Sequence, residues 1–279
     1  MALPHKIWMS NASVPLVHEV EILDEAGRRK TTHIPGERPL TIYLDKREVV
    51  TLMTLGGAPE ALVLGYLRNQ RLVESPDDIE SIQVDWETDS AAVKTHRSSV
   101  DIDALTSKRV VTTGCGQGTM FGGLMEDMAK IELPDGPQLS QEAIVALIEA
   151  IRVHDTIYKK SGSVHACAVF ERVGKNQVRM LYFIEDVGRH NAVDSISGLM
   201  WLDGKAGRDL IFFTTGRLTS EMVIKGVQMG IPFLLTRSGV TLMGLELARK
   251  TRLTLLSRCS GKHFEIYNAS ERVIFSPPA

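Results

Sequence analysis

One cysteine of this chain stands in a stretch with almost no bulky side chains. Cys115 lies in TTGCGQGTMFGG, where Gly114 and Gly116 leave its sulfur sterically open. As a thiolate, such a sulfur can attack an electrophile or carry a second sulfur as a persulfide. Gly118 occupies the fourth position of what would otherwise be a CxxC pair, so a redox dithiol is excluded here. A small residue in a tight turn is the alternative interpretation.

Two further segments gather polar side chains where a predicted strand ends and a helix begins. EDVGRHNAVDS spans residues 185–195, and TTGRLTSEM spans residues 214–222. Helix N-termini bind anions, and open α/β sheets place their ligands at such strand ends. Ordinary helix capping is the alternative at both junctions. The candidate ligand-binding residues are Glu185, Asp186, Arg189, His190, Asn191 and Asp194 in the first segment and Gly216, Arg217, Ser220 and Glu221 in the second.

Other kinds of site have less support in the sequence. Cys167 alternates with His165 in a predicted central strand, which favours core packing for both side chains. No CxxC or HxxxH pairing occurs, so we predict no bound metal. The chain also lacks a GxxxxGKS/T phosphate loop and a GxGxxG after a strand, which argues against an ATPase or a dinucleotide-dependent dehydrogenase.

Composition and charge bound the class of protein. The chain has 279 residues, and 32 basic against 34 acidic side chains give a net charge of −2, which does not suggest a nucleic-acid binder. No segment approaches the roughly 18 consecutive apolar residues of a membrane span, and the N-terminus lacks a signal-peptide pattern. Three widely spaced cysteines fit a reducing compartment. We therefore predict a cytoplasmic protein with no nucleic-acid or membrane partner.

Short alternating runs before the cysteine segment predict the strands of a small mixed sheet. The runs cover residues 18–23, 40–45, 49–54, 81–85 and 108–113. One helix interrupts them, because Pro59 suits a first helical position and Leu62, Tyr66 and Leu67 recur at helical spacing. The first part of the chain is therefore predicted to be α+β, with this helix packed across the sheet.

A stretch with proline and glycine at residues 133–138 predicts the boundary between two domains, 1–137 and 138–279. Ser140 can cap a long helix that reaches Lys159 and Lys160, with Gly162 beyond its end. Later runs predict strands at 164–170, 178–184, 210–215, 232–236, 253–257 and 264–267 and helices at 190–200, 219–229 and 242–250. This order predicts a layered α/β domain whose sheet is covered on both faces.

Taken in order, these motifs resemble those of the FdhD family, the formate dehydrogenase accessory sulfurtransferases. The matching stretches are GCG, GSVHACAVF, EDVGRHNAVDS, TTGRLTSEM and LTLLSRCSGKHFEIY, with ERPLTIYLDKREVVTLMT and EALVLGYLRNQRLVES before them. The likeness thus covers nearly the whole chain. It implies a homodimer in which an α+β N-terminal domain carries the cysteine loop and a cytidine-deaminase-like three-layer α/β/α domain follows.

The resemblance also implies a sulfur carrier. Members receive sulfur from a cysteine desulfurase as a cysteine persulfide and pass it to the molybdenum or tungsten bis-guanine-dinucleotide cofactor before its insertion into formate dehydrogenase. By position, Cys115 matches the first cysteine of the family's CGxC loop, and Gly118 replaces the second. Many members are richer in arginine in the segment implied to bind the cofactor or guanine nucleotides such as GDP. That segment here comprises Arg258, Cys259, Ser260, Gly261, Lys262 and His263.

Two other functions stay open. A chaperone that binds the cofactor or the apo-enzyme without sulfur chemistry needs no second loop thiol, and Gly118 fits that reading. A nucleotide-processing enzyme on a deaminase scaffold is the other alternative. Such an enzyme needs the deaminase zinc signature, which is missing from the sequence.

Overall fold

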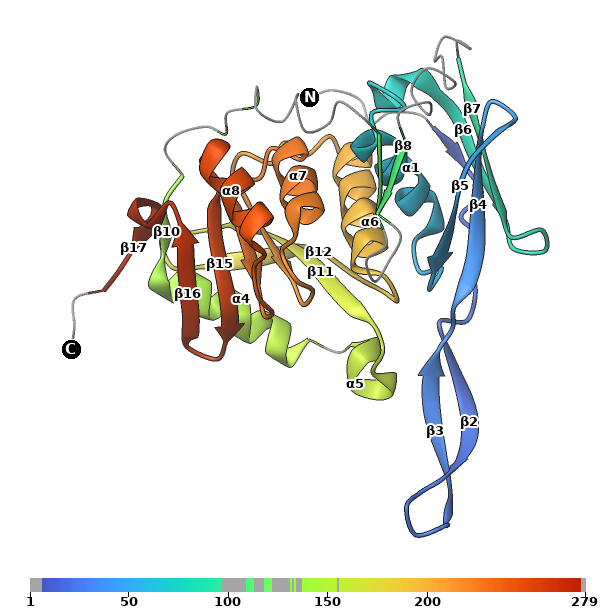
Figure 1. The fold of residues 1–279 in the computed structure, drawn as a ribbon, viewed down its shortest axis with the longest axis horizontal. Helices are drawn as coiled ribbons and strands as arrows, with labels where there is room; N and C mark the ends of the chain where they lie inside the picture. Colours follow the sequence, from blue (N-terminus) through green and yellow to red (C-terminus); the bar gives the residue numbers. More distant parts are fainter. Residues whose placement is uncertain are drawn as a thin grey trace.

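Two sheets dominate the computed structural model, which describes residues 7–96, 109–112, 118–121, 131, 133, 137–154 and 156–276. A five-stranded sheet belongs to the N-terminal half of the chain and a six-stranded sheet to the C-terminal half (Figure 1). Cys115 lies outside the described residues, so the expectation for its surroundings stays a prediction.

The six-stranded sheet follows the predicted order of elements. Its strands are β11 (His165–Arg172), β12 (Val178–Asp186), β13 (Leu210–Thr214), β14 (Phe233–Thr236), β15 (Thr254–Ser260) and β16 (His263–Asn268). They lie in the order β12-β11-β13-β14-β15-β16. β13, β14 and β15 are parallel, whereas β11 is antiparallel to both of its neighbours. The carboxyl ends of β12, β13, β14 and β15 therefore meet at one edge, beside the first residue of β11.

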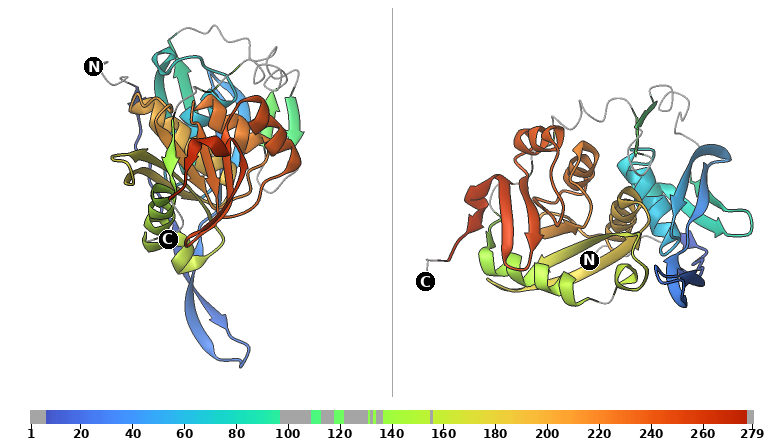
Figure 2. Two further views of the ribbon diagram at one scale, coloured as in Figure 1. Left: turned by 90° about the vertical axis from the view of Figure 1, so that its left-hand side faces the viewer. Right: turned by 60° about the horizontal axis from the view of Figure 1, so that its bottom comes forward.

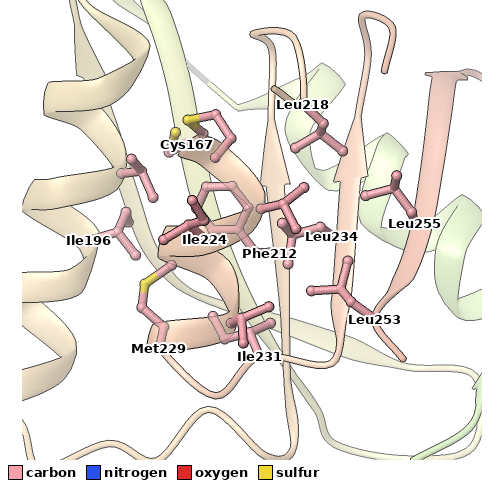
Figure 3. Close-up of a cluster of buried hydrophobic side chains, with 14 of the residues drawn as sticks. Cys167, Ile196, Phe212, Leu218, Ile224, Met229, Ile231, Leu234, Leu253 and Leu255 are labelled. Carbon is pink, nitrogen blue, oxygen red and sulfur yellow. The ribbon is translucent and has the colours of Figure 1, made fainter. Parts of the chain in front are cut away.

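Helices cover both faces of this sheet, which confirms the predicted three-layer α/β/α arrangement. α4 (Gln141–Val153) lies on one face, and α6 (Arg189–Leu202), α7 (Ser220–Gln228) and α8 (Leu242–Lys250) lie on the other (Figures 1 and 2). Neighbouring residues of β13 enter different cores. Phe212 packs with Ile196 and Ile224 under α6 and α7 (Figure 3), whereas Phe213 packs with Ile144 under α4. The apolar run of β13 is thus explained by burial on both sides.

The prediction of one long helix after Ser140 is wrong. Ser140 caps α4 as expected, with its hydroxyl accepting an amide at 3.1 Å, but α4 ends at Val153. His154 has an extended ψ of 138°, and its ring packs 4.3 Å from that of Phe183 on β12. Thr156 then caps a second, short helix, α5 (Ile157–Ser161), which carries the two lysines. A new capping residue after a helical run therefore marks the break.

The N-terminal sheet contains parallel and antiparallel neighbours, as predicted. Its strands are β1 (Trp8–Met9), β4 (Arg38–Leu44), β5 (Arg47–Thr54), β6 (Ile79–Asp85, after the 3₁₀ turn η1, Pro76–Asp78) and β7 (Ser90–Thr95), in the order β1-β6-β7-β4-β5. The helix α1 (Pro59–Asn69) begins at Pro59, and Leu62, Tyr66 and Leu67 are all buried against the sheet. The strands β1 and β7 were not predicted from the sequence. β1 has only two residues, which is too short to show a period, and β7, with the sequence SAAVKT, has few bulky side chains.

Two of the predicted strands lie outside this mixed sheet, which corrects the prediction. β2 (Val17–Leu23) pairs with β3 (Arg29–Pro35) in a ribbon that projects from the molecule, and β8 (Arg109–Thr112) pairs with β9 (Gly118–Phe121) (Figure 1). Most side chains of β2 are exposed, so its alternation does not reflect a buried face. A further short pair joins β10 (Leu139–Ser140) to β17 (Val273–Ile274), which follows the 3₁₀ turn η2 (Ser270–Arg272).

The two halves of the chain meet where α1 crosses α6. A Cβ added to Gly65 of α1 would lie 1.7 Å from the carbonyl oxygen of Asp194, and one added to Gly198 of α6 would lie 2.0 Å from that of Ala61. The backbones of α1 and α6 are therefore in direct contact, which is possible because both positions are glycine. The boundary between residues 137 and 138 stays a prediction. No helix in the described ranges is long and apolar enough to cross a membrane.

Candidate functional site

A cavity of about 650 Å³ opens at the carboxyl edge of the six-stranded sheet, on the side of α4 and α5. Its volume lies within the roughly 300–1,000 Å³ typical of small-ligand pockets. The lining combines an apolar wall with basic and hydroxyl groups, so it suits a ligand with an apolar part and a negative charge. The apolar residues are Ile148, Ile151, Val164, Phe183 and Phe213, and the polar ones include Arg152, Thr156, Tyr158, Lys159, His165, Glu185, Thr215, Arg237, Ser238, Arg258 and Ser260.

Arg237 and Arg258 bring two guanidinium groups to neighbouring strand ends. Arg237 follows β14, and its amide donates to the carbonyl of Thr214 at 3.1 Å. Arg258 sits in a bulge of β15 with a left-handed φ of 54°, and its amide donates to the carbonyl of Ser238 at 3.1 Å. Both side chains are exposed, and within the described ranges neither makes an ion pair. Both residues line the cavity, so each guanidinium group is available to an anion that enters it.

The other two basic side chains at the cavity already have partners. The guanidinium of Arg152 lies 2.6 Å from the carboxylate of Glu149, and both groups are exposed to solvent. The ammonium group of Lys159 donates to the carbonyl of His154 at 2.6 Å. The exposed ion pair of Arg152 is weak and the partner of Lys159 is an uncharged carbonyl, so both cations still add positive potential on the side of α4 and α5.

His165 joins the cavity at the first residue of β11. Its half-burial lowers the pKa of the imidazole below the usual value, and the charges of Arg189 and Arg217 lower that pKa further. Arg189 and Arg217 act on this imidazole from outside the cavity lining. His165 is therefore neutral at pH 7, and a bound anion would raise its pKa.

The carboxylate of Glu185 is turned toward backbone amides. Its Oε2 accepts from the amide of Ile157 at 2.5 Å, and its Oε1 accepts from the amide of Tyr158 at 3.1 Å. These amides belong to the first turn of α5. Glu185 thus lines the cavity, and both of its carboxylate oxygens accept amides at the start of a helix.

Asp186 and Asn191 connect the two halves of the chain. The carboxylate of Asp186 accepts from the hydroxyl of Thr54 at 2.5 Å and from the amides of Leu55 and Gly188 at 3.2 and 3.0 Å. The side-chain amide of Asn191 donates to that carboxylate at 3.0 Å and to a carbonyl at the end of β5 at 2.6 Å. Both side chains are buried, so this network fixes the β12–α6 turn against the end of β5.

Deeper in the molecule, Asp194 is paired inside the helix layer. Its carboxylate lies 2.8 Å from the ammonium of Lys225 on α7 and accepts from the side-chain amide of Asn69 on α1 at 2.7 Å. His190 lies 3.1 Å from Glu221 across the starts of α6 and α7. Burial, followed by the charges of nearby basic groups, lowers the pKa of His190 to about 2, so this imidazole is neutral.

The second predicted junction is tightly packed. A Cβ added to Gly216 would lie 2.8 Å from a side-chain carbon of Arg189, which is why glycine follows β13 at this position. Arg189 is buried, whereas Arg217 is exposed and Ser220 is half-buried at the start of α7. These residues surround the edge of the sheet without lining the cavity.

Both cysteines in the described part of the chain are buried. Cys167 is 0% exposed and belongs to the core under α6 and α7, as core packing predicted (Figure 3). Cys259 is 1% exposed and lies in the cavity lining. Burial raises the pKa of each thiol to about 12. Neither thiol is therefore an accessible thiolate at neutral pH.

The cavity collects some of the predicted binding residues and not others. The predicted residues that line it are Glu185, Arg258, Cys259, Ser260 and Gly261. Lys262 and His263 follow as exposed residues at the turn between β15 and β16. Sequence reasoning missed Arg237, although TRSG after β14 is a polar strand end like the two that it did select. Among the described residues, no group of three or more His, Cys, Asp or Glu side chains could hold a metal ion.

The fold and this cavity define a class, a three-layer α/β protein with a cation-lined pocket at the carboxyl edge of its sheet. Such edges are the usual ligand sites of open α/β sheets. Comparison with known proteins then gives the family. The model of the FdhD/NarQ family matches residues 35–274, so this chain belongs to that family.

Its relatives carry a consistent description. Proteins named sulfur carrier protein FdhD from Saccharolobus solfataricus and Sulfurisphaera tokodaii are 30% and 29% identical to this chain, over 91% and 94% of it and 96% and 99% of their own lengths. The protein of that name from Listeria monocytogenes is 28% identical over 86% of this chain and 91% of its own. A crystal structure described as a formate dehydrogenase accessory protein from Desulfotalea psychrophila superposes with a TM-score of 0.72 at 25% identity, covering 93% of this chain and 100% of its own.

Proposed function

We propose that this protein is a sulfur carrier for formate dehydrogenase maturation. Cys115 accepts sulfur as a persulfide from a cysteine desulfurase and delivers it to a molybdenum or tungsten bis-guanine-dinucleotide cofactor. The cofactor is the substrate of this sulfurtransferase, and one of its nucleotide ends occupies the cavity. The protein acts in the cytoplasm as a homodimer, with the formate dehydrogenase apo-enzyme as its client.

The observation that carries the proposal is the cavity with its two guanidinium groups, which form no ion pair within the part of the chain that the structure describes. Guanidinium groups bind phosphate oxygens through paired charge-assisted hydrogen bonds, so Arg237 and Arg258 suit a diphosphate. The apolar wall beside them, with Phe183 and Phe213, suits a purine ring. The volume of about 650 Å³ lies within the range of small-ligand pockets and therefore suits one nucleotide end of the cofactor.

The state of the other cysteines supports Cys115 as the sulfur carrier. A persulfide carrier must be reached by a donor enzyme and then by a bulky acceptor, and it must react as a thiolate. Cys167 and Cys259 are buried, with pKa values raised to about 12, so neither meets these needs. The chain has three cysteines, and the remaining one, Cys115, stands between two glycines.

The loading step balances without an external oxidant or reductant. The thiolate of Cys115 attacks the terminal sulfur of the persulfide on the desulfurase, and a new S–S bond forms. The S–S bond of the donor breaks, and the donor cysteine leaves as a thiolate. One thiol suffices for this step, so Gly118 in place of a second cysteine does not prevent it.

Mass spectrometry after incubation with a desulfurase and cysteine tests this step. We expect an added sulfur on the peptide that contains Cys115, and its loss in Cys115→Ala. Cys259→Ala is the matched control and should keep the adduct. The Cys115→Ala protein should fold and bind GDP normally and should fail to mature formate dehydrogenase. Full maturation by that variant would contradict the proposal.

A cofactor chaperone without sulfur chemistry is the second candidate, and Gly118 is the observation that favours it. Such a protein would use the same cavity to hold the cofactor for the apo-enzyme. It predicts normal GDP binding, no sulfur adduct on Cys115, and formate dehydrogenase maturation that survives Cys115→Ala. The experiment above therefore separates the two candidates.

A further inference from the structure

The short helix α5 is a wall between two cavities. On one side, Thr156, Tyr158 and Lys159 line the cavity of about 650 Å³. On the other side lies a cavity of about 260 Å³, lined by Thr156, Ile157 and Lys160 and, from the N-terminal half, by Leu16 and Gly57. Phe183 and Glu185 of β12 line both cavities. A displacement of α5 would therefore open the larger cavity into the smaller one.

This wall contacts the strand β3 of the projecting ribbon, but its own side chains are poorly buried. None of the five residues of α5 is buried, and Tyr158 is 53% exposed. Both flanks leave the helical conformation, because His154 has an extended ψ of 138° and Gly162 has a φ of 66°. Segments with few buried apolar contacts open most readily. The hydrogen bonds at its start therefore help to determine where α5 lies, together with its contact with β3.

Glu185 supplies the bonds at the start of α5. Its two carboxylate oxygens accept from the amides of Ile157 and Tyr158 at 2.5 and 3.1 Å, and its side chain is almost fully buried. Thr156 adds one local cap, accepting from the amide of Lys159 at 3.1 Å. Glu185 itself stands on a rigid part of the fold, because the next residue, Asp186, is fixed to the end of β5.

The geometry points to Glu185 as a positioning residue that holds α5 closed over the nucleotide cavity and does not itself bind the ligand. A free carboxylate beside phosphates would oppose binding by repulsion. Here both oxygens instead accept amides at the positive end of a helix. Glu185 therefore controls how fast a bound nucleotide leaves. This inference rests on the proposed function, because it assumes that the larger cavity holds a guanine nucleotide.

The test compares Glu185→Gln with Glu171→Gln. The second substitution removes the same charge at the opposite end of the sheet, where Glu171 pairs with Arg179. Amide hydrogen exchange reports on α5, and stopped-flow measurements with a fluorescent GDP analogue report on the ligand. In Glu185→Gln the amides of Ile157 and Tyr158 should lose protection, and GDP should dissociate about tenfold faster with a smaller change in the association rate. Glu171→Gln should change neither.

Several results would overturn the inference. One is an unchanged dissociation rate in Glu185→Gln, and another is loss of GDP binding while the α5 amides stay protected, which would mean direct contact with the ligand. If Glu185→Gln does not fold, the unmodified protein still provides a test. Rapid exchange of its Ile157 and Tyr158 amides would mean that Glu185 does not hold them, which would contradict the inference. If the unmodified protein binds no guanine nucleotide, the ligand part of the proposed function fails, and exchange alone decides whether Glu185 anchors α5.

Discussion

The buried imidazole of His190 makes the stability of this protein depend on pH in a way that distinguishes a core residue from a ligand-binding one. The unfolded chain takes up a proton at this side chain below about pH 6.5. The folded chain does so only near its lowered pKa of about 2. Unfolding therefore becomes more favourable as the pH falls through 6.5. The contribution of His190 to the free energy of unfolding is therefore fully present above about pH 6.5 and is lost progressively as the pH falls below that value.

The size of the effect depends mainly on the pKa of the His190 side chain in the unfolded protein. Between about pH 7 and about pH 4.5 the free energy of unfolding should fall by about 2.5 kcal/mol through this one group. Burial is the largest cause of the lowered pKa, and the charges of Lys225, Arg189 and His165 add to it.

The assay is denaturant unfolding of the unmodified protein and of His190→Gln at a series of pH values. Glutamine keeps a donor toward Glu221 and cannot take up a proton. The difference in unfolding free energy between the two proteins should change by about 2.5 kcal/mol over that pH range. NMR should show the His190 resonance constant down to about pH 4. A resonance that titrates near pH 6.5, or a pH-independent difference between the proteins, would refute the buried neutral state.

Three further predictions concern the cavity and the helix contact. Arg258→Ala should weaken GDP binding about tenfold in calorimetric titrations and leave guanosine binding nearly unchanged, whereas Arg179→Ala at the far end of the sheet should alter neither. A bound phosphate should raise the lowered pKa of His165, so lowering the pH from about 7.5 to about 5.5 should favour GDP binding to the unmodified protein more than to His165→Asn; an equal pH dependence in the two proteins would exclude this group, since protonation of the terminal phosphate of GDP acts on both. Gly198→Ala should destabilise the protein by about 1–3 kcal/mol in thermal unfolding, because its Cβ would meet a backbone carbonyl at 2.0 Å. Gly174→Ala, where a Cβ has room, should leave the midpoint almost unchanged.

The C-terminal layer could be predicted from the sequence because its signals are local. Buried apolar runs such as β13, and a capping residue such as Ser140, act within a few residues of the element that they define. The alternation in residues 18–23 is also local, but it does not say which partner a strand has. A projecting ribbon and a sheet strand therefore look alike until pairing is known.

The candidate site could be predicted only in part, because polar side chains at a strand end can face solvent or another part of the protein. Asp186 bonds to Thr54 and Asp194 to Asn69, partners that lie 132 and 125 residues away in the chain. Nothing in the sequence near the motif reveals such partners. Arg258 was predicted through the resemblance to a known family. Arg237 was not predicted, although it follows a strand just as the residues of the two selected junctions do.

The most direct test of this account is a crystal structure of the protein with GDP. We expect the diphosphate beside the guanidinium groups of Arg237 and Arg258, and the purine against Phe183 and Phe213 under α4 and α5. A nucleotide bound instead at the starts of α6 and α7, next to Arg217, with the cavity of about 650 Å³ empty, would contradict it.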